Sequence, residues 1–445
     1  MRNAAICLLT SDRHATKRGA KNRSVGYEWW NRVAVFNLLF LLPFSAVQGF
    51  KAHQEISQRV HRFTFQSYHR CQVDGLPNLQ EDLEYIPSSR QLTEYSLKCV
   101  HLEKLYTQHA QREIRLQQSQ ANRAEAFGRH VSKFGFAYNF AYMVMKFAQA
   151  IDKRVAFVYV NESLGRYSGQ ACLPFNNTYE CFFNSPAKTA NLPITEVIYG
   201  PKDLKSTRFS IRVPKEYQEL GYFWYHAQLL RVLWDPNHKM LARIARAKRE
   251  IGLSRNLTSY NMIGMHVRHG DSCYARKQTK RCPPFEEYLK HARSFRDKYN
   301  VSSIYLATDD AELAQRVRAS KHIIDGFSFY MQSFIDDNSV VQRALIKYED
   351  EPAQFTIGAL KIGDNATDNS EAAARLIIDL TLLSTSEFFI GTFTSNIGRL
   401  AYELMYIEKG YRPYISLDIA WCSRWGSKLP RRYRDAKPAP VLVAC

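Results

Sequence analysis

Residues 266–273, HVRHGDSC, place cationic and acidic side chains directly after an apolar run that is typical of a buried strand. Arg268 carries a permanently charged guanidinium whose donors match the oxygens of a diphosphate, and His266 can donate a hydrogen bond to the same oxygens. Such groups neutralise a nucleoside diphosphate that departs in a transfer reaction. An Arg–Asp salt bridge that only ties down a loop would use the same residues, so both interpretations stay open.

Two further polar motifs follow apolar runs. In LATDD, Asp309 and Asp310 can serve as a general base, as metal ligands, or as the N-cap and first-turn acid of the next helix. In GTFTSN, Thr392, Thr394 and Ser395 precede a helix whose unpaired N–H groups form an anion site, although hydroxyl side chains at such places are usually capping residues. The occurrence of all three motifs at successive strand ends favours a common site.

The elements that position these motifs alternate along the chain. Strands are expected at 262–267, 303–308, 322–330 and 388–392, and helices at 285–299, 311–319, 370–386 and 396–407. This alternation predicts a doubly wound parallel sheet, in which ligands bind at the carboxyl ends of the strands. We therefore expect the three motifs to meet at one edge of the sheet.

The preceding half of the chain is less informative about chemistry. Residues 54–127 are polar and helix-rich and indicate a stem, whose long amphipathic helix would pack or self-associate. Residues 133–159 predict a glycine-bearing turn, a helix and a buried strand, whereas 161–212 are rich in loops. Residues 217–251 are strongly helical, with an apolar stripe typical of core packing.

The N-terminus predicts a membrane anchor. Residues 33–50 are uncharged and apolar and follow a basic segment, so the N-terminus should stay cytoplasmic while the rest is lumenal. A cleavable signal peptide followed by secretion is the alternative, since small residues lie near a potential processing site. Five sequons agree with a lumenal location: Asn161, Asn176, Asn256, Asn300 and Asn365.

The net charge and the cysteines further limit the class of protein. The formal charge of +19 could attract nucleic acid, anionic lipid or a phosphorylated small molecule. No Lys/Arg block interleaved with aromatic residues is present, so no nucleic-acid binding is expected. No CxxC or HxxxH pattern occurs, so no metal site is expected. Three pairs among the nine cysteines could form disulfides: Cys172 with Cys181, Cys273 with Cys282, and Cys71 with Cys99.

The three motifs, read as HVRHGD, YLATDD and NSEAAARLIIDLTLLSTSEFFIGTFTSNIGRLAYELM, resemble in order and spacing those of the α1,6-fucosyltransferases. This family includes the core N-glycan enzymes and the rhizobial chitin-oligosaccharide enzymes, and HVRHG is more similar to the latter. The likeness covers roughly residues 98–407. It implies metal-independent, inverting transfer of L-fucose from GDP-fucose to a GlcNAc-containing glycan, α1,6 to the N-glycan core. No cofactor is implied besides this donor substrate.

The resemblance also implies a GT-B-like architecture, in which an open α/β domain precedes a Rossmann-type nucleotide-binding domain, behind a helical stem and a Golgi membrane anchor. A homodimer through the stem is a further expectation. The expected divisions are a cytoplasmic tail (1–32), a signal anchor (33–50), a helical stem (51–130), an N-terminal α/β domain (131–255), a Rossmann-type GDP-fucose-binding domain (256–415) and a C-terminal tail (416–445).

Roles of individual residues are implied by their match to the family motifs. Arg268 would bind the diphosphate and the departing GDP, and His266 and His269 would make further contacts with GDP. Asp379 would bind the guanine or the ribose, and Thr392, Thr394 and Ser395 would bind phosphate. The catalytic cleft would contain Asp309, Asp310 and Asp271, and Gly135 would allow the backbone to approach the nucleotide closely.

Several residues that bear on the acceptor and its base depart from the family pattern. The second arginine of the family is His269 here, and its Asp-Lys pair is Asp271-Ser272. The expected glutamate has no clear counterpart, and Gly391 and Gly398 occupy the positions of a cysteine bridge in vertebrate relatives. The alternatives are transfer to a chitin-type oligosaccharide or to protein Ser/Thr, a non-catalytic GDP-sugar or glycan-binding protein, and a membrane-tethered structural protein.

Overall fold

A computed structural model defines the fold. It describes residues 82–88, 90–92, 101–127, 135–160, 167, 169, 172, 174–175, 178–187, 192–198, 211–253, 260–269, 282–332 and 367–421. Every described residue belongs to one compact unit, Gln66–Cys445. The predicted cytoplasmic tail, the signal anchor and the first part of the stem lie outside the described residues, as do Asp271, Cys71 and Cys99. Within the described ranges, no helix has the length and apolar character needed to cross a membrane.

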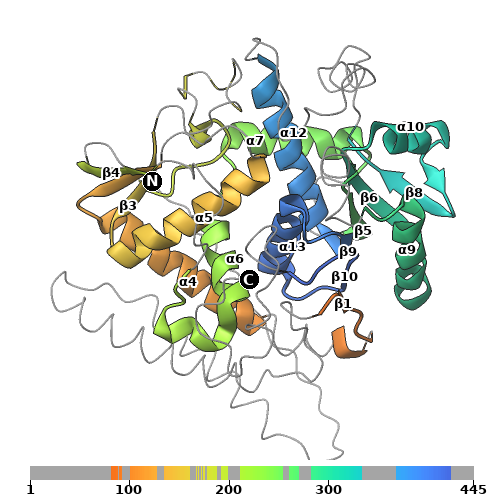
Figure 1. The fold of residues 1–445 in the computed structure, drawn as a ribbon, viewed down its shortest axis with the longest axis horizontal. Helices are drawn as coiled ribbons and strands as arrows, with labels where there is room; N and C mark the ends of the chain where they lie inside the picture. The colour runs from red at the N-terminus through yellow and green to blue at the C-terminus, as the bar shows by residue number, and fades with distance from the viewer. Residues whose placement is uncertain are drawn as a thin grey trace, which may run out of the picture. The chain divides into compact units, whose positions relative to one another are not determined.

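A seven-stranded sheet is the larger of the two sheets in the described structure (Figure 1). Its spatial order is β1 (Glu84–Tyr85), β10 (Tyr414–Ser416), β9 (Ser386–Gly391), β5 (Tyr260–Val267), β6 (Ser303–Thr308), β8 (Phe327–Tyr330) and β7 (Ile323–Ile324). The strands from β10 to β8 pair in parallel, and the two edge strands are antiparallel. In chain order the parallel strands follow the 3-2-1-4-5 arrangement of nucleotide-binding sheets.

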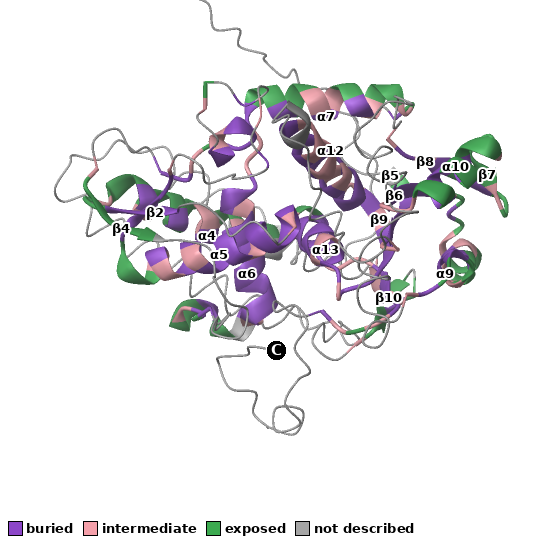
Figure 2. Ribbon diagram, turned by 45° about the horizontal axis from the view of Figure 1, so that its top comes forward, coloured by how far each residue is buried: buried purple, intermediate pink, exposed green. Residues whose placement is uncertain are grey.

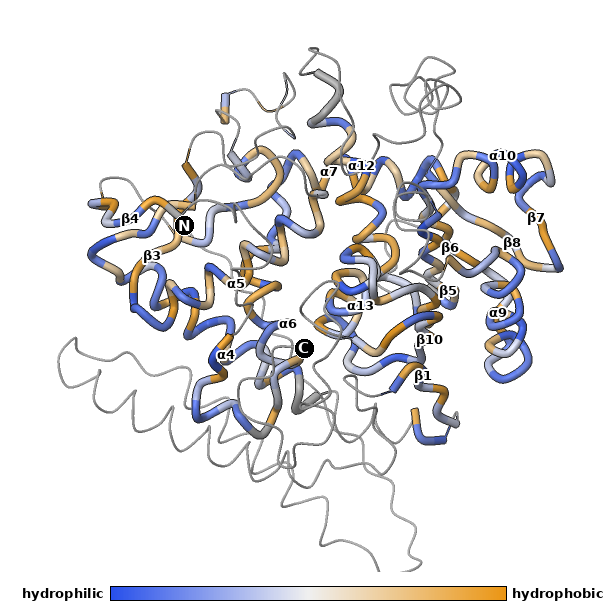
Figure 3. Tube along the Cα trace, viewed as in Figure 1, coloured by the Kyte–Doolittle hydropathy of each residue, from blue (hydrophilic) through white to orange (hydrophobic). Residues whose placement is uncertain are grey.

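The expected alternation of strands and helices is confirmed in this part of the chain. The helices are α9 (Phe285–Tyr299), α10 (Ala311–Ala319), α12 (Thr367–Ser384) and α13 (Asn396–Lys409). Buried apolar side chains of β5, β6 and β9 pack against them, and Figure 3 shows apolar stretches at β5 and β6 in orange. Because both faces of the sheet are covered, its strands are apolar along most of their length.

The sequence prediction of one strand over 322–330 is wrong, because the segment folds as a hairpin. Strands β7 and β8 pair antiparallel on either side of Asp325 and Gly326. Both turn residues have positive φ, 54° and 74°. An Asp-Gly turn of this kind matches the twist of the flanking strands, and the dipeptide was the available signal.

Residues at the end of the described chain also differ from the expectation. Strand β10 was not predicted, and residues 416–421, assigned to a C-terminal tail, continue from it into the core. Leu417 and Trp421 are both buried. A strand of three residues is too short for its alternating pattern to be recognised in the sequence. The pairing of β10 with β9 extends the sheet on the side of the GTFTSN motif.

A second, three-stranded sheet has β2 (Ala124–Phe127) between β3 (Ala156–Tyr159) and β4 (Ile194–Ile198), all parallel. Helix α5 (Phe136–Lys153) leads into β3, as the sequence predicted. Helix α4 (His101–Gln120) and β2 fall in the range assigned to the stem, yet both pack into this region. The buried Gln118 side chain accepts from Phe157 N (2.6 Å) and donates to Val155 O (3.0 Å), so the amphipathic helix is fastened to β3.

The helical segment expected over 217–251 is interrupted. It consists of the 3-10 helix η5 (Lys215–Leu220), α6 (Gly221–Leu233) and α7 (His238–Glu250), with Pro236 at the break between the last two. A buried contact between His226 Nδ1 and Glu403 Oε2 (3.1 Å) joins α6 to α13, which is largely buried in Figure 2. Helices α6 and α7 therefore connect the helices beside the small sheet to the helices that pack on the large sheet.

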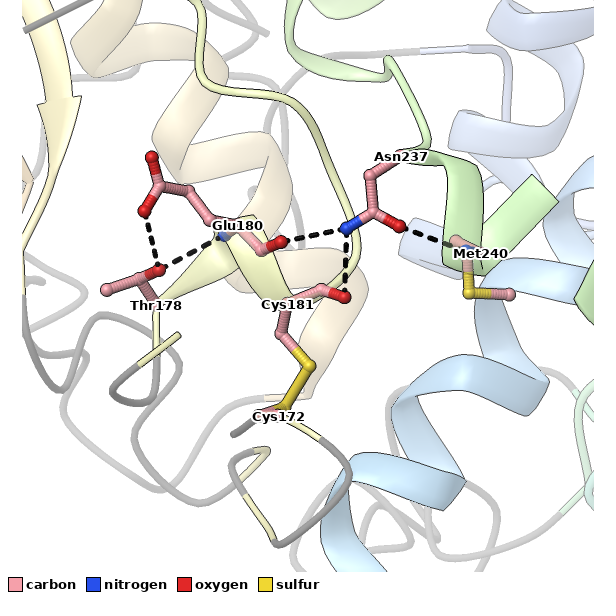
Figure 4. The surroundings of a disulfide bond; sticks show 6 residues. All are labelled: Cys172, Thr178, Glu180, Cys181, Asn237 and Met240. Carbon is pink, nitrogen blue, oxygen red and sulfur yellow. Dashed lines mark hydrogen bonds between the residues drawn. A yellow bond between two sulfur atoms is a disulfide. The ribbon is translucent and has the colours of Figure 1, made fainter. Parts of the chain in front are cut away.

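The predicted Cys172–Cys181 disulfide is present beside this break (Figure 4). Asn237 caps α7, because its side-chain oxygen accepts from Met240 N (3.0 Å). Its amide nitrogen donates to the backbone oxygens of Glu180 (2.8 Å) and Cys181 (3.1 Å). The cap thus binds the disulfide loop to the start of α7. Cys282 is also disulfide-bonded, whereas Cys273, its expected partner, lies outside the described residues.

We predict that Asn237→Ala lowers the free energy of unfolding by about 2 kcal/mol, because a helix cap and two buried donors are lost together. Asn237→Ser keeps a capping oxygen and should cost about half as much. Urea denaturation of both variants measures this difference, and equal stability of the alanine variant and the wild type would contradict the role given to Asn237.

Candidate functional site

The three polar motifs meet at one edge of the large sheet, as the sequence predicted. Strand β5 lies between β6 and β9, with Val267 opposite Thr308 and Met265 opposite Ile390. Residues that follow these strands therefore leave the sheet side by side. The chain crosses over in opposite directions from β5 and from β9, so this edge is the topological switch point at which doubly wound sheets bind ligands.

Arg268 is held by Asp309 across the ends of β5 and β6. A guanidinium nitrogen of Arg268 forms an ion pair with Asp309 Oδ2, and both side chains are mostly buried. The other oxygen, Oδ1, accepts from His269 N (2.9 Å). The salt bridge weighed for the first motif thus exists, but it joins two motifs and orients the guanidinium at the strand ends.

His269 and Asp310 form a second pair beside the first. Asp310 Oδ2 lies 2.8 Å from His269 Nδ1, while Oδ1 caps α10 by accepting from Leu313 N (3.0 Å). The hydrogen bond from His269 holds the pKa of Asp310 below its usual value, and the same bond raises the pKa of His269. The N-cap interpretation of LATDD therefore holds for Asp310, which also contacts the ring of His269.

His266 points from the end of β5 toward the start of α13. It is buried, and its Nδ1 has no hydrogen-bond partner among the described residues. Burial, together with the nearby charge of Arg268, lowers its pKa to about 3, so the imidazole is neutral near pH 7. An ideal Cβ placed on Gly398 would lie 3.6 Å from this nitrogen. The ring is therefore a neutral polar group at the helix start.

Asp418 fixes the loop between β9 and α13. Its Oδ1 accepts from Phe393 N (2.9 Å), and its Oδ2 accepts from Thr394 N (3.2 Å) and from the Thr394 hydroxyl. Ser416 Oγ donates to Oδ1 as well (3.1 Å). The Asp418 carboxylate thus accepts the hydrogen bonds that a bound anion would otherwise accept. The Thr394 hydroxyl also donates to this carboxylate.

Thr392 and Ser395 are buried in the same loop, and Ser395 is the N-cap residue of α13 although its side chain makes no capping hydrogen bond. Two glycines allow the loop to lie close to the helix. A Cβ on Gly398 would overlap the carbonyl oxygen of Thr392, and one on Gly391 would lie 2.8 Å from the ring of Phe389. Close packing against the backbone therefore requires a glycine at 398, whereas a side chain at 391 would have to displace the ring of Phe389.

Arg399 adds a buried cation to the first turn of α13. Burial lowers its pKa to about 10, while the charges of Glu403 and Asp418 raise it. Tyr138 of α5 also raises this pKa, so the start of α5 approaches α13. Gly135, the N-cap residue of α5, lies three residues before Tyr138 and has extended backbone geometry.

Asp379 lies apart from the strand-end cluster, on α12. Its Oδ1 accepts from the hydroxyl of Tyr305 on β6 (2.6 Å) and from Gln332 Nε2 (2.6 Å). Burial raises its pKa to about 6, against the effect of these two hydrogen bonds. No described contact joins it to Arg268 or Asp309.

The structure thus brings together Arg268, His269, Asp309 and Asp310, with His266 and the 392–395 loop beside them. Sequence reasoning missed Asp418 and Arg399. Arg399 occurs inside a quoted motif, but Asp418 follows an unpredicted strand and had no signal of its own. Within the described ranges, no group of three or more His, Cys, Asp or Glu side chains could hold a metal ion.

Comparisons with known proteins agree on one family. Residues 215–419 match the family model "Alpha-(1,6)-fucosyltransferase N- and catalytic domains". The α-(1,6)-fucosyltransferase of Drosophila melanogaster is 24% identical over 188 residues, which are 41% of this chain. The chain spans only 25% of that relative's length.

Several solved structures are similar. Fucosyltransferase NodZ from Bradyrhizobium has a TM-score of 0.35 at 17% identity, over 64% of this chain and 93% of that one. A variant of Arabidopsis thaliana FUT1 in complex with GDP has a TM-score of 0.36 at 11% identity, over 73% and 79%. POFUT1 in complex with GDP has a TM-score of 0.34 at 8% identity, over 66% and 98%.

We predict that Asp418→Ala lowers the free energy of unfolding by about 3 kcal/mol, because several hydrogen bonds to a charged group are lost at once. Amide hydrogen exchange at Phe393 and Thr394 should accelerate. Asp297→Ala, which truncates a 77% exposed aspartate, is the matched control. If the two alanine variants are equally stable, Asp418 does not fix the loop.

The raised pKa of Asp379 predicts a pH effect on stability. Between its ordinary value of 3.8 and about 6, the folded protein binds a proton that the unfolded chain has lost. Stability should therefore fall as pH rises through this window. Asp379→Asn should remove this part of the pH dependence, measured as the difference in unfolding free energy between the variant and the wild type. A constant difference across the window would contradict the assignment.

Proposed function

Because residues 215–419 belong to the α1,6-fucosyltransferase family, we propose that the protein transfers L-fucose from GDP-fucose to a GlcNAc-containing glycan, with inversion and without a metal ion. The observation that carries this proposal is the placement of Arg268 at the switch point between β5 and β9, held there by Asp309. A fixed guanidinium at this place suits a diphosphate, since its donors form two parallel hydrogen bonds.

The donor would extend from this point along the sheet edge. Arg268 and the neutral His266 would bind the diphosphate, together with the hydroxyls of Thr392 and Ser395 at the start of α13. Thr394 would act through the loop, since its hydroxyl is bonded to Asp418. Asp379 would accept hydrogen bonds from the guanine or the ribose, and Gly135 would permit close approach of the backbone to the nucleotide.

The transfer itself needs an acceptor hydroxyl in line with the anomeric carbon of fucose. The hydroxyl oxygen forms the new bond while the bond from that carbon to the β-phosphate oxygen breaks, and its electron pair leaves with GDP. The hydroxyl proton passes to a base. Asp309 and Asp310 both bind cations, and the lowered pKa of Asp310 makes it a weak base. These two carboxylates would therefore organise the cleft.

The fold and location complete the proposal. The described large sheet would be the nucleotide-binding half of a GT-B-like enzyme, and the small sheet would belong to the other half. The apolar run 33–50 would anchor the chain in the Golgi membrane with the catalytic part in the lumen. The Cys172–Cys181 disulfide supports an oxidising compartment, where such bonds persist.

The decisive experiment measures GDP release from GDP-fucose by the full chain in EDTA, with and without a GlcNAc-terminated N-glycan. Release that depends on the acceptor is expected, and the linkage of the product would test the α1,6 assignment. Transfer to a chitin oligosaccharide or to a peptide hydroxyl instead would correct the acceptor. Saturable GDP binding without release would contradict the transferase and indicate a binding protein.

Arg268→Ala should lower kcat by about 10²–10³-fold, the loss typical of one preorganised donor to a developing negative charge. Arg293→Ala is the matched control, because it removes an Arg–Asp ion pair (2.6 Å to Asp325) on the exposed face of α9. The control should keep wild-type turnover. Turnover of Arg268→Ala within a factor of about two of the control would refute the role of Arg268 in neutralising the departing diphosphate.

A further inference from the structure

His269 is bonded through both ring nitrogens. Nδ1 lies 2.8 Å from Asp310 Oδ2, and Nε2 lies 2.7 Å from the backbone oxygen of Pro283. A carbonyl oxygen can only accept, so Nε2 must carry a proton. An ionised carboxylate also only accepts, so Nδ1 must carry one too. Both bonds exist together only when the ring is the imidazolium cation.

The backbone of His269 connects this ring to the diphosphate-binding guanidinium. Its N–H donates to Asp309 Oδ1 (2.9 Å), and the other oxygen of Asp309 pairs with Arg268. The ring and the backbone N–H of one residue thus bind two consecutive carboxylates, Asp310 and Asp309. Movement of the ring would therefore disturb the N–H that orients Asp309.

The groups around the ring are consistent with a cation. Among the described residues, Asp309 and Asp310 face it from the end of β6, Arg268 precedes it directly after β5, and the ring of Tyr288 on α9 meets it edge-on at 6.3 Å between centroids. Two carboxylates outweigh one guanidinium in charge. Burial of the imidazole opposes protonation, but the hydrogen bond to Asp310 has the larger effect and the pKa of His269 is raised.

We propose that His269 is a positioning residue that acts as an imidazolium, and that loss of one ring proton releases Asp310 or Pro283 and loosens the Asp309–Arg268 pair. Turnover therefore decreases on the alkaline side. This inference rests on the proposed function, because it assigns His269 a part in the same diphosphate site. The family pattern has an arginine at this position. The histidine has a physical consequence, because it loses its charge in a pH range in which an arginine stays charged.

The direction of the pH effect follows from the raised pKa. The cation is present below the ordinary histidine value of 6.5 and is lost as pH rises through the higher value of the folded protein. Activity should therefore be full on the acidic side of this transition and decrease above it. The change should be in kcat, because the ring acts through Arg268 on the departing diphosphate.

The test is the pH profile of acceptor-dependent GDP release for the wild type, His269→Gln and His269→Arg. The glutamine variant, which cannot donate to both acceptors as a cation, should lose roughly tenfold in kcat on the acidic side and show no alkaline decrease. The arginine variant keeps its charge and should retain turnover at alkaline pH. His238→Gln, on the exposed surface of α7, should keep the wild-type profile.

A second measurement does not depend on turnover. In ¹³C-labelled protein, the ring resonance that disappears in His269→Gln should titrate above 6.5 in the wild type. A titration at or below 6.5, or an unchanged alkaline decrease in the glutamine variant, would overturn the inference while leaving the proposed function intact. Absence of turnover by the wild type at every pH would overturn the proposed function and with it the part of His269 in it.

Discussion

The parallel pairing of β5 with both β6 and β9 is the constraint on which the site depends. Its register places Val267 opposite Thr308 and Met265 opposite Ile390, so the three motifs leave the sheet at one edge. The paired strands are buried, and a shift of one residue would turn their apolar side chains to the opposite face. Burial of the strands therefore also determines where Arg268, Asp309 and the loop after β9 lie.

At that edge the protein supplies its own counter-ions. Asp309 pairs with Arg268, Asp310 with His269, and Asp418 with the donors of residues 393 and 394. A buried guanidinium or buried hydrogen-bond donors without partners would be costly, so these carboxylates stabilise the site before any ligand enters. They also orient the donors, which lowers the reorganisation required when a negative charge develops.

Much of this arrangement could be predicted from the sequence. Long periodic segments such as β5, α9 and α13 were recognisable, and strand alternation was enough to place Arg268 and Asp309 together. Two short elements were missed for different reasons. Strand β10 has only three residues, whereas the turn at Asp325 lies inside an apolar run but carried the Asp-Gly signal. Asp418 follows the unpredicted β10, and its role depends on a contact across 24 residues of sequence. No local sequence pattern predicts a contact between residues so far apart in the chain.

Helix α13 connects this edge to the rest of the described structure. Its start carries the loop held by Asp418, and its middle carries Glu403, whose carboxylate meets the buried His226 of α6. Contact between two buried polar groups fixes the relative position of α6 and α13, because displacing either group leaves the other without its partner. The small residue Gly398 brings the same helix against Thr392. The position of the loop 392–395 is thus determined from both sides, by the sheet through Asp418 and by α6 through Glu403.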